Sequence, residues 1–245
     1  MDGWTTGNVP GLKEDVDTPA AVDSEIRKVT ATNVTQSLPP DATLPPPISP
    51  VFQWNTDGQF IQSRPTGTRL NLLMAKLRNN TGGPVTSFEV AYDFAEVLGN
   101  VGEEVPGLRA FYSLTGASNS WVALPALNSA TNGPLTATLN VTNWPAGRAL
   151  WLLWGDDNAS ESEGAYTIDN FAISNVVPMM QPTLSITRSV AGTVTLNWTE
   201  VGFTLQQSVA LLGTNTPWAD VLGPVTTGPF QTNNPVGRQF YRLRP

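Results

Sequence analysis

The densest set of side chains that could bind a metal ion lies between residues 156 and 169. Ca²⁺ takes about six to eight hard oxygen ligands, which carboxylate and amide side chains supply. The candidate ligands are Asp156, Asp157, Asn158, Glu161, Glu163 and Asp169. Their spacing differs from that of the helix-loop-helix calcium loop. A solvated turn, in which Asp and Asn cap their own backbone, accounts for the same residues. The sequence leaves both alternatives open, a structural Ca²⁺ or a turn, and indicates no other cofactor.

Acidic side chains could also provide the carboxylate pair of a glycoside hydrolase, a chemistry that needs no histidine. The candidates are Asp93, Glu96, Glu103, Glu104, Asp156, Asp157 and Asp169. With 20 acidic residues in the chain, chance pairs are expected, and sequence does not give their separation. The chain has no His and no Cys, which excludes Ser-His-Asp and Cys-His catalysis and thiolate ligands. We therefore interpret the chain as non-catalytic and keep hydrolysis as a third alternative.

Eight tryptophans offer flat faces that could stack on sugar rings. Trp151, Trp154 and Trp198 lie in segments with strong strand patterns, which favours the core. The other candidates, near strand ends or loops, are Trp54, Trp121 and Trp144. These are expected either to form an exposed glycan platform or to pack beneath loops.

The element that must position the acidic residues is the strand before them. Residues 148–154, RALWLLW, would present apolar side chains on both faces if extended. This pattern predicts a central strand buried on both sides. Gly155 and the following Asp and Asn residues supply turn chemistry, and a second strand is expected over 166–174.

Alternating patterns predict further strands on both sides of this pair. Residues 88–95 alternate large apolar with polar or small side chains, and residues 135–141 do the same. Gly, Asn and Pro turns separate the strands, and helical periodicity is almost absent. We predict an all-β fold: a jelly-roll-like β-sandwich over 51–177, then a small immunoglobulin- or fibronectin-like β-sandwich over 178–245.

Residues 1–50 are predicted to form an extended arm and a proline-rich connector, LPPDATLPPPISP, which favours polyproline II. A disordered linker is the alternative on composition. The β-branched residues of the arm could complete an open sheet edge of a neighbouring copy. The assembly residues are Lys28, Val29, Thr30, Ala31, Thr32, Asn33 and Val34.

The formal net charge of −7 argues against nucleic acid as a partner, because binding there needs a basic face. No apolar run is long enough to span a membrane. The first residues lack the basic and apolar regions of a leader, so we expect a cytoplasmic protein or a mature form without its leader.

Two sets of motifs resemble known bacterial modules. The segments FYSLTG (111–116), WPAG (144–147), LLWGDDN (152–158) and TIDNF (167–171) resemble a jelly-roll module of large bacterial secreted and surface proteins. The segments VTLNW (194–198), FTLQ (203–206) and FYRL (240–243) resemble the fibronectin-like or immunoglobulin-like C-terminal domains of such proteins, notably from Verrucomicrobia and Planctomycetes. The resemblance implies a secreted or cell-surface, non-catalytic β protein, and it supplies no catalytic residues.

The leading hypothesis from the sequence is a structural surface protein whose arm packs on a neighbouring copy, giving a homo-oligomer, polymer or filament. The main alternative is a calcium-stabilised carbohydrate-binding module with polysaccharide as its partner.

Overall fold

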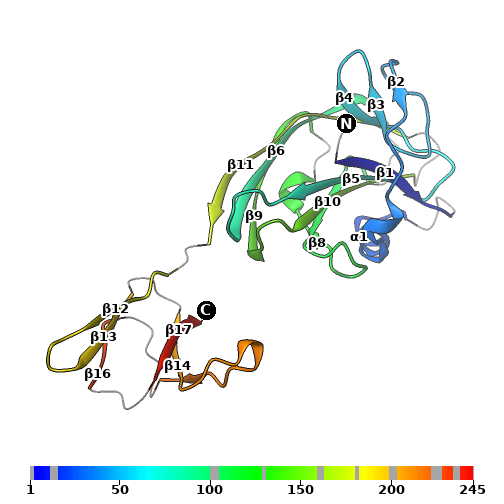
Figure 1. Cartoon of the computed structure of the whole chain (residues 1–245). Helices are drawn as coiled ribbons and strands as arrows, with labels where there is room; N and C mark the ends of the chain where they lie inside the picture. The colour runs from blue at the N-terminus through cyan, green and yellow to red at the C-terminus, as the bar shows by residue number, and fades with distance from the viewer. Residues whose placement is uncertain are drawn as a thin grey trace. The chain divides into compact units, whose positions relative to one another are not determined.

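The computed structural model describes residues 3–11, 16–99, 105–128, 131–158, 163–179, 182–198, 203–221, 228–233 and 238–244. The chain divides into two compact units, Met1–Met179 and Met180–Pro245 (Figure 1). Both are built from β-strands, which confirms the all-β prediction.

Two sheets form the first unit. The first sheet has five strands in the order β1 (Trp4–Val9), β5 (Leu70–Arg78), β10 (Ala149–Asp157), β7 (Arg109–Ser113) and β8 (Val122–Ala123). The second has six, in the order β2 (Pro40–Asp41), β3 (Gln53–Asn55), β4 (Phe60–Ser63), β11 (Ala165–Pro178), β6 (Val85–Leu98) and β9 (Gly133–Trp144). A short 3₁₀ helix, η3 (Pro125–Leu127), joins β8 to β9.

The connectivity of strands β4 to β11 is that of a jelly roll. They run β4-β11-β6-β9 in one sheet and β5-β10-β7-β8 in the other, and every neighbouring pair is antiparallel. The first strand of the series therefore lies beside the last, as in two interlocked Greek keys. The predicted jelly-roll β-sandwich is confirmed.

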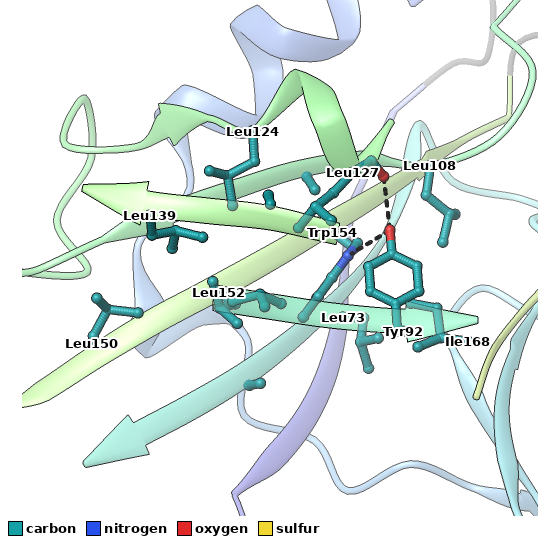
Figure 2. Packing of buried hydrophobic residues seen from close by; sticks show 14 of the residues in the cluster. Leu73, Tyr92, Leu108, Leu124, Leu127, Leu139, Leu150, Leu152, Trp154 and Ile168 are labelled. Atoms are coloured by element: carbon teal, nitrogen blue, oxygen red, sulfur yellow. Dashed lines mark hydrogen bonds between the residues drawn. The ribbon is translucent and has the colours of Figure 1, made fainter. Parts of the chain in front are cut away.

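The main core lies between the two sheets. Leu150, Leu152 and Trp154 point into it from β10 and are almost completely buried. Figure 2 shows Trp154 donating through Nε1 to the hydroxyl of Tyr92 (3.3 Å), while that hydroxyl donates to the carbonyl of Leu127 (2.7 Å). These bonds satisfy polar groups that would otherwise be costly to bury.

A second core covers the other face of β10. Helix α1 (Pro19–Lys28) begins at Thr18, whose hydroxyl accepts from the backbone N–H of Ala21, and it has Pro19 in its first turn. Val22 and Ile26, one turn apart, are fully buried. They share a cluster with side chains of β5 and β10, including Leu72 and Leu153. Strand β10 is thus buried on both faces, as its sequence predicts.

Lys28 to Val34 do not form a strand, which corrects that part of the prediction, whereas their packing on a neighbouring copy stays a prediction. They form the end of α1, a loop and the 3₁₀ helix η2 (Ala31–Asn33), and they contact their own domain. The indole N–H of Trp121 donates to the carbonyl of Val29 (2.8 Å), and the backbone N–H of Ala31 donates to Gly116 (2.8 Å). The physical reason is that the outer face of β5 and β10 is apolar and this segment covers it.

The rest of residues 1–50 also belongs to the first unit. Strand β1 pairs with β5 throughout its length, and Gln36 bridges to Thr6 on its other side. In the proline-rich connector, β2 pairs in parallel with β3, and Ser49 bridges to Pro65. The structure therefore places these residues on the sandwich instead of in a separate extended arm.

The second unit is a small sandwich of two three-stranded sheets. One sheet has the strand order β12 (Ser185–Arg188), β13 (Thr193–Asn197), β16 (Phe230–Asn233). The other has the order β15 (Ala219–Asp220), β14 (Thr204–Ser208), β17 (Phe240–Arg244). The 3₁₀ helix η4 (Gly213–Asn215) follows β14. Leu196, Trp198, Leu205 and Val221 are its buried centre. No helix in the described part of the chain has the length and hydrophobicity that a membrane crossing requires.

Candidate functional site

The candidate metal ligands are divided by the fold. Asp156 and Asp157 end strand β10 and are buried, as are Asn158 and Glu163. The side-chain amide of Asn158 donates to the carbonyl of Thr68, so this group acts as a donor there. Glu161 lies outside the described residues.

Asp169 lies in the opposite sheet, on β11, directly across from Asp93 of β6. Within the described ranges, no three acidic side chains come close enough together to hold a metal ion. The calcium site stays a prediction.

Two of the three tryptophans proposed as a glycan platform are buried, which corrects that part of the prediction. Trp121 is 1% exposed and Trp144 is 4% exposed. The ring of Trp144 packs against Phe88 with centroids 5.2 Å apart, and its N–H donates to Arg148 (3.0 Å). Trp54 on β3 is only partly buried and lies in a cleft.

This cleft, which we call the aromatic cleft, has a volume of about 190 Å³. It is formed by β1, β3, β4, β11 and the turn between β3 and β4, elements that Figure 1 locates. Its lining residues are Trp4, Trp54, Gln59, Phe60, Ile61, Ile168, Asp169, Asn170 and Phe171. Trp4 comes from the edge strand of one sheet and Trp54 from near the edge of the other, so the cleft lies where the sandwich opens.

Trp4 is held by other aromatic rings. It stacks on Trp154 with centroids 5.6 Å apart and planes inclined by 27°, and it meets the edge of Phe171 at 4.9 Å. Such contacts add about 0.5–1.5 kcal/mol each beyond area burial. Because Trp154 is itself fixed by its bond to Tyr92, this wall of the cleft is preorganised.

A β-bulge in β11 shapes the part of the cleft beside Trp4. Strand β11 pairs in regular register from Tyr166 to Asp169 and again from Ala172, and between them Asn170 and Phe171 oppose one residue of β6. Asn170 has φ 50°, and its N–H donates to the Asp169 carboxylate (2.7 Å). Its side-chain amide donates to Asp93 (2.7 Å). The extra residue turns Phe171 toward Trp4 while leaving Asn170 exposed on the rim.

Gln59, in the turn between β3 and β4, also has a positive φ, 58°. This conformation is uncommon for a residue other than glycine, asparagine or aspartate. Its backbone N–H donates to Asn55 (2.9 Å), and Asn55 in turn accepts the N–H of Gly58 at 2.7 Å. One uncommon backbone position, that of Gln59, and one positive-φ asparagine, Asn170, thus lie at the same cleft.

The arrangement suits non-covalent binding of a small polar ligand with apolar faces. Four partly buried aromatic rings, those of Trp4, Trp54, Phe60 and Phe171, lie beside one carboxylate and two amides. Of the acidic residues considered for hydrolysis, Glu103 and Glu104 lie outside the described residues, and among the others only Asp169 lines the cleft. Its opposite neighbour Asp93 lies beside it in the same sheet instead of across a cleft.

Sequence reasoning missed Trp4. The segment Thr5-Thr6 beside it is β-branched, a strand signal that we assigned to no strand.

Neither a protein-family model nor a curated protein matches the chain. Among solved structures, the chain is similar to the adhesin domain of Epf from Streptococcus pyogenes. The identity is 10% and the TM-score 0.35, with 95% of this chain and 80% of that one covered. A similarity this low carries no argument about function.

Proposed function

We propose that the chain is a carbohydrate-binding β-sandwich protein of the cell surface or extracellular space, which binds glycans in the aromatic cleft without catalysis. The observation that carries the proposal is that two partly exposed tryptophans, Trp4 and Trp54, converge with polar side chains at one open edge of the sandwich.

Sugar rings fit this chemistry because they have apolar C–H faces and a polar rim of hydroxyls. Trp4 and Trp54 can cover the faces, while Gln59, Asp169 and Asn170 can bond to the hydroxyls. Covering about 100 Å² of apolar surface contributes about 2.5 kcal/mol, at roughly 25 cal/mol per Å². Rigid walls reduce the ordering cost that binding must overcome.

The test is a glycan array, followed by calorimetry on any ligand found. Trp54→Ala is expected to weaken binding at least tenfold, about 1.4 kcal/mol. The matched control is Trp218→Ala, which removes a partly exposed tryptophan that stacks with Arg242 in the second unit. The proposal fails if no glycan binds, or if Trp54→Ala and the control bind like the unaltered protein.

A second candidate function, a subunit of a surface assembly, is supported by the edge strand β9. Among the described strands it pairs only with β6, and it spans 12 residues with no charged side chain. Such a long uncharged edge is a template for pairing with another chain. If it assembles, sedimentation velocity will show oligomers that grow with concentration, and Thr138→Lys will abolish them. A monomer at all concentrations rejects this candidate.

We also infer that the second unit is fibronectin-like. Its sheets, β12-β13-β16 and β15-β14-β17, have the strand order of the first six strands of that fold. A solution structure of this unit with a different strand order would reject the assignment.

A further inference from the structure

We infer that the aromatic cleft recognises one uncharged sugar ring at the end of a glycan chain and discriminates against acidic sugars. The inference rests on the proposed function and names its ligand class.

The size of the cleft limits the ligand to about one ring. Its volume, about 190 Å³, is below the roughly 300–1,000 Å³ of sites that enclose drug-sized ligands. The two tryptophans come from different sheets, Trp4 from β1 and Trp54 from β3. Both line this one small space, and neither strand contributes a second tryptophan that would extend the cleft to a further ring.

The charge of the cleft disfavours an acidic ring. Asp169 lines it, Asp93 lies directly opposite Asp169 on the sheet, and no Lys or Arg is among the lining residues. A uronic acid or sialic acid would bring its carboxylate close to Asp169 with no cation to compensate. Like charges repel, and the partial burial of Asp169 leaves this repulsion less screened than it would be in bulk water.

The free hydrogen-bonding groups favour hydroxyls. Asn170 uses its N–H on Asp169 and its side-chain NH₂ on Asp93, so its side-chain oxygen remains as an acceptor on a residue that lines the cleft. Asp169 has a second oxygen with accepting capacity. Acceptors of this kind need donors on the ligand, which sugar hydroxyls provide and ring carboxylates do not.

The first experiment measures affinity against chain length for a neutral oligosaccharide series at equal molar concentration of molecules. Recognition of chain ends predicts a constant affinity per molecule, because each chain has one such end. Recognition of internal rings predicts an affinity that rises with length, because the number of sites rises. A rise with length overturns the chain-end assignment.

The second experiment compares a neutral monosaccharide with its uronate, for example glucose with glucuronate. The unaltered protein is expected to bind the uronate at least tenfold more weakly. Asp169→Asn keeps an acceptor for the N–H of Asn170 but removes the charge, so it should reduce this discrimination to less than threefold. Asp17→Asn, at an exposed position before α1, is the control and should leave it unchanged.

Equal binding of neutral and acidic sugars by the unaltered protein overturns the charge assignment. So does discrimination that survives Asp169→Asn. In both cases glycans still bind, and their binding still depends on Trp54. Failure of the proposed function is a different result, in which no glycan binds or Trp54→Ala has no effect on binding.

Discussion

Docking of α1 on β10 is tested by adding one methyl group at Gly155. A Cβ there would lie 2.5 Å from Cδ1 and 3.0 Å from Cγ1 of Ile26. Carbon atoms pack at about 3.5–4.0 Å, so the overlap with Cδ1 is about 1 Å or more. Ile26 is fully buried, which leaves its side chain little room to move. Gly155→Ala is therefore expected to lower the free energy of unfolding by about 1–3 kcal/mol.

Ile26→Val removes the clashing Cδ1 atom and should by itself cost about 0.5–1.5 kcal/mol. In the double variant the new methyl group occupies the space that Cδ1 left. The combined cost is expected to be at least about 1 kcal/mol smaller than the sum of the two single costs, a coupling that residues in contact show.

The assay is urea unfolding followed by tryptophan fluorescence. All of the eight tryptophans except Trp198 and Trp218 lie in the first unit, so the signal reports mainly on that unit. Costs that add to within about 0.3–0.5 kcal/mol would mean that Gly155 and Ile26 are not in contact. A coupling that appears only at high protein concentration would mean that α1 docks on another copy of the chain, and it would refute docking of α1 on β10 of its own chain.

Three other outcomes are expected in the same assay. Burial raises the pKa of Tyr92 well above its usual range, an effect that the bond from Trp154 only partly offsets. The contribution of neutral Tyr92 to stability is therefore complete below about pH 10, where the unfolded tyrosine also stays neutral. Above that pH it is lost by up to about 1.4 kcal/mol per pH unit. Tyr92→Phe should show a smaller loss of stability at high pH, and an unchanged pH profile would contradict the assignment of this loss to Tyr92. Asp23→Asn breaks the bidentate pair of hydrogen bonds that Arg109 donates to Asp23, 2.8 and 2.9 Å long. The free energy of unfolding should fall by about 1 kcal/mol after allowance for partial exposure of the pair. Lys28→Met, at the exposed end of α1, should lower it by less than about 0.5 kcal/mol. Trp121→Phe removes the hydrogen bond from the indole N–H to the carbonyl of Val29. The free energy of unfolding should fall by about 1–3 kcal/mol, because this carbonyl is left without its donor in a buried site. A change near zero would show that water replaces the indole N–H.

The patterns that the sequence determined are those with a short period. Residues 150–154 are apolar at every position, which requires a strand covered on both faces, and β10 is such a strand. The alternation in β6 and β9 likewise specified which side faces the core. These features depend only on neighbouring residues and the two faces of a strand.

The same reasoning was wrong for residues 19–28. An extended arm was predicted there, with β-branched residues such as Val22 and Ile26 as its strand signal, yet these two are four residues apart, which places them on one face of a helix. Thr18 and Pro19 are standard signals for a helix start. β-branched residues were given too much weight, because packing on β10 outweighs their intrinsic preference.

What only the tertiary structure decided is which aromatic residues stay accessible. Trp54 and Trp144 both lie near strand ends in the sequence, but Phe88 covers Trp144, while Trp54 lies near the open edge of its sheet. The aromatic cleft joins residues 4, 54 and 171, which no local pattern connects. They meet because two sheets stack with β1 and β3 near the same opening and because a bulge in β11 turns Phe171 toward Trp4. Stacking and bulges of this kind depend on contacts between distant segments, and a single sequence does not encode those contacts in its local periodicity.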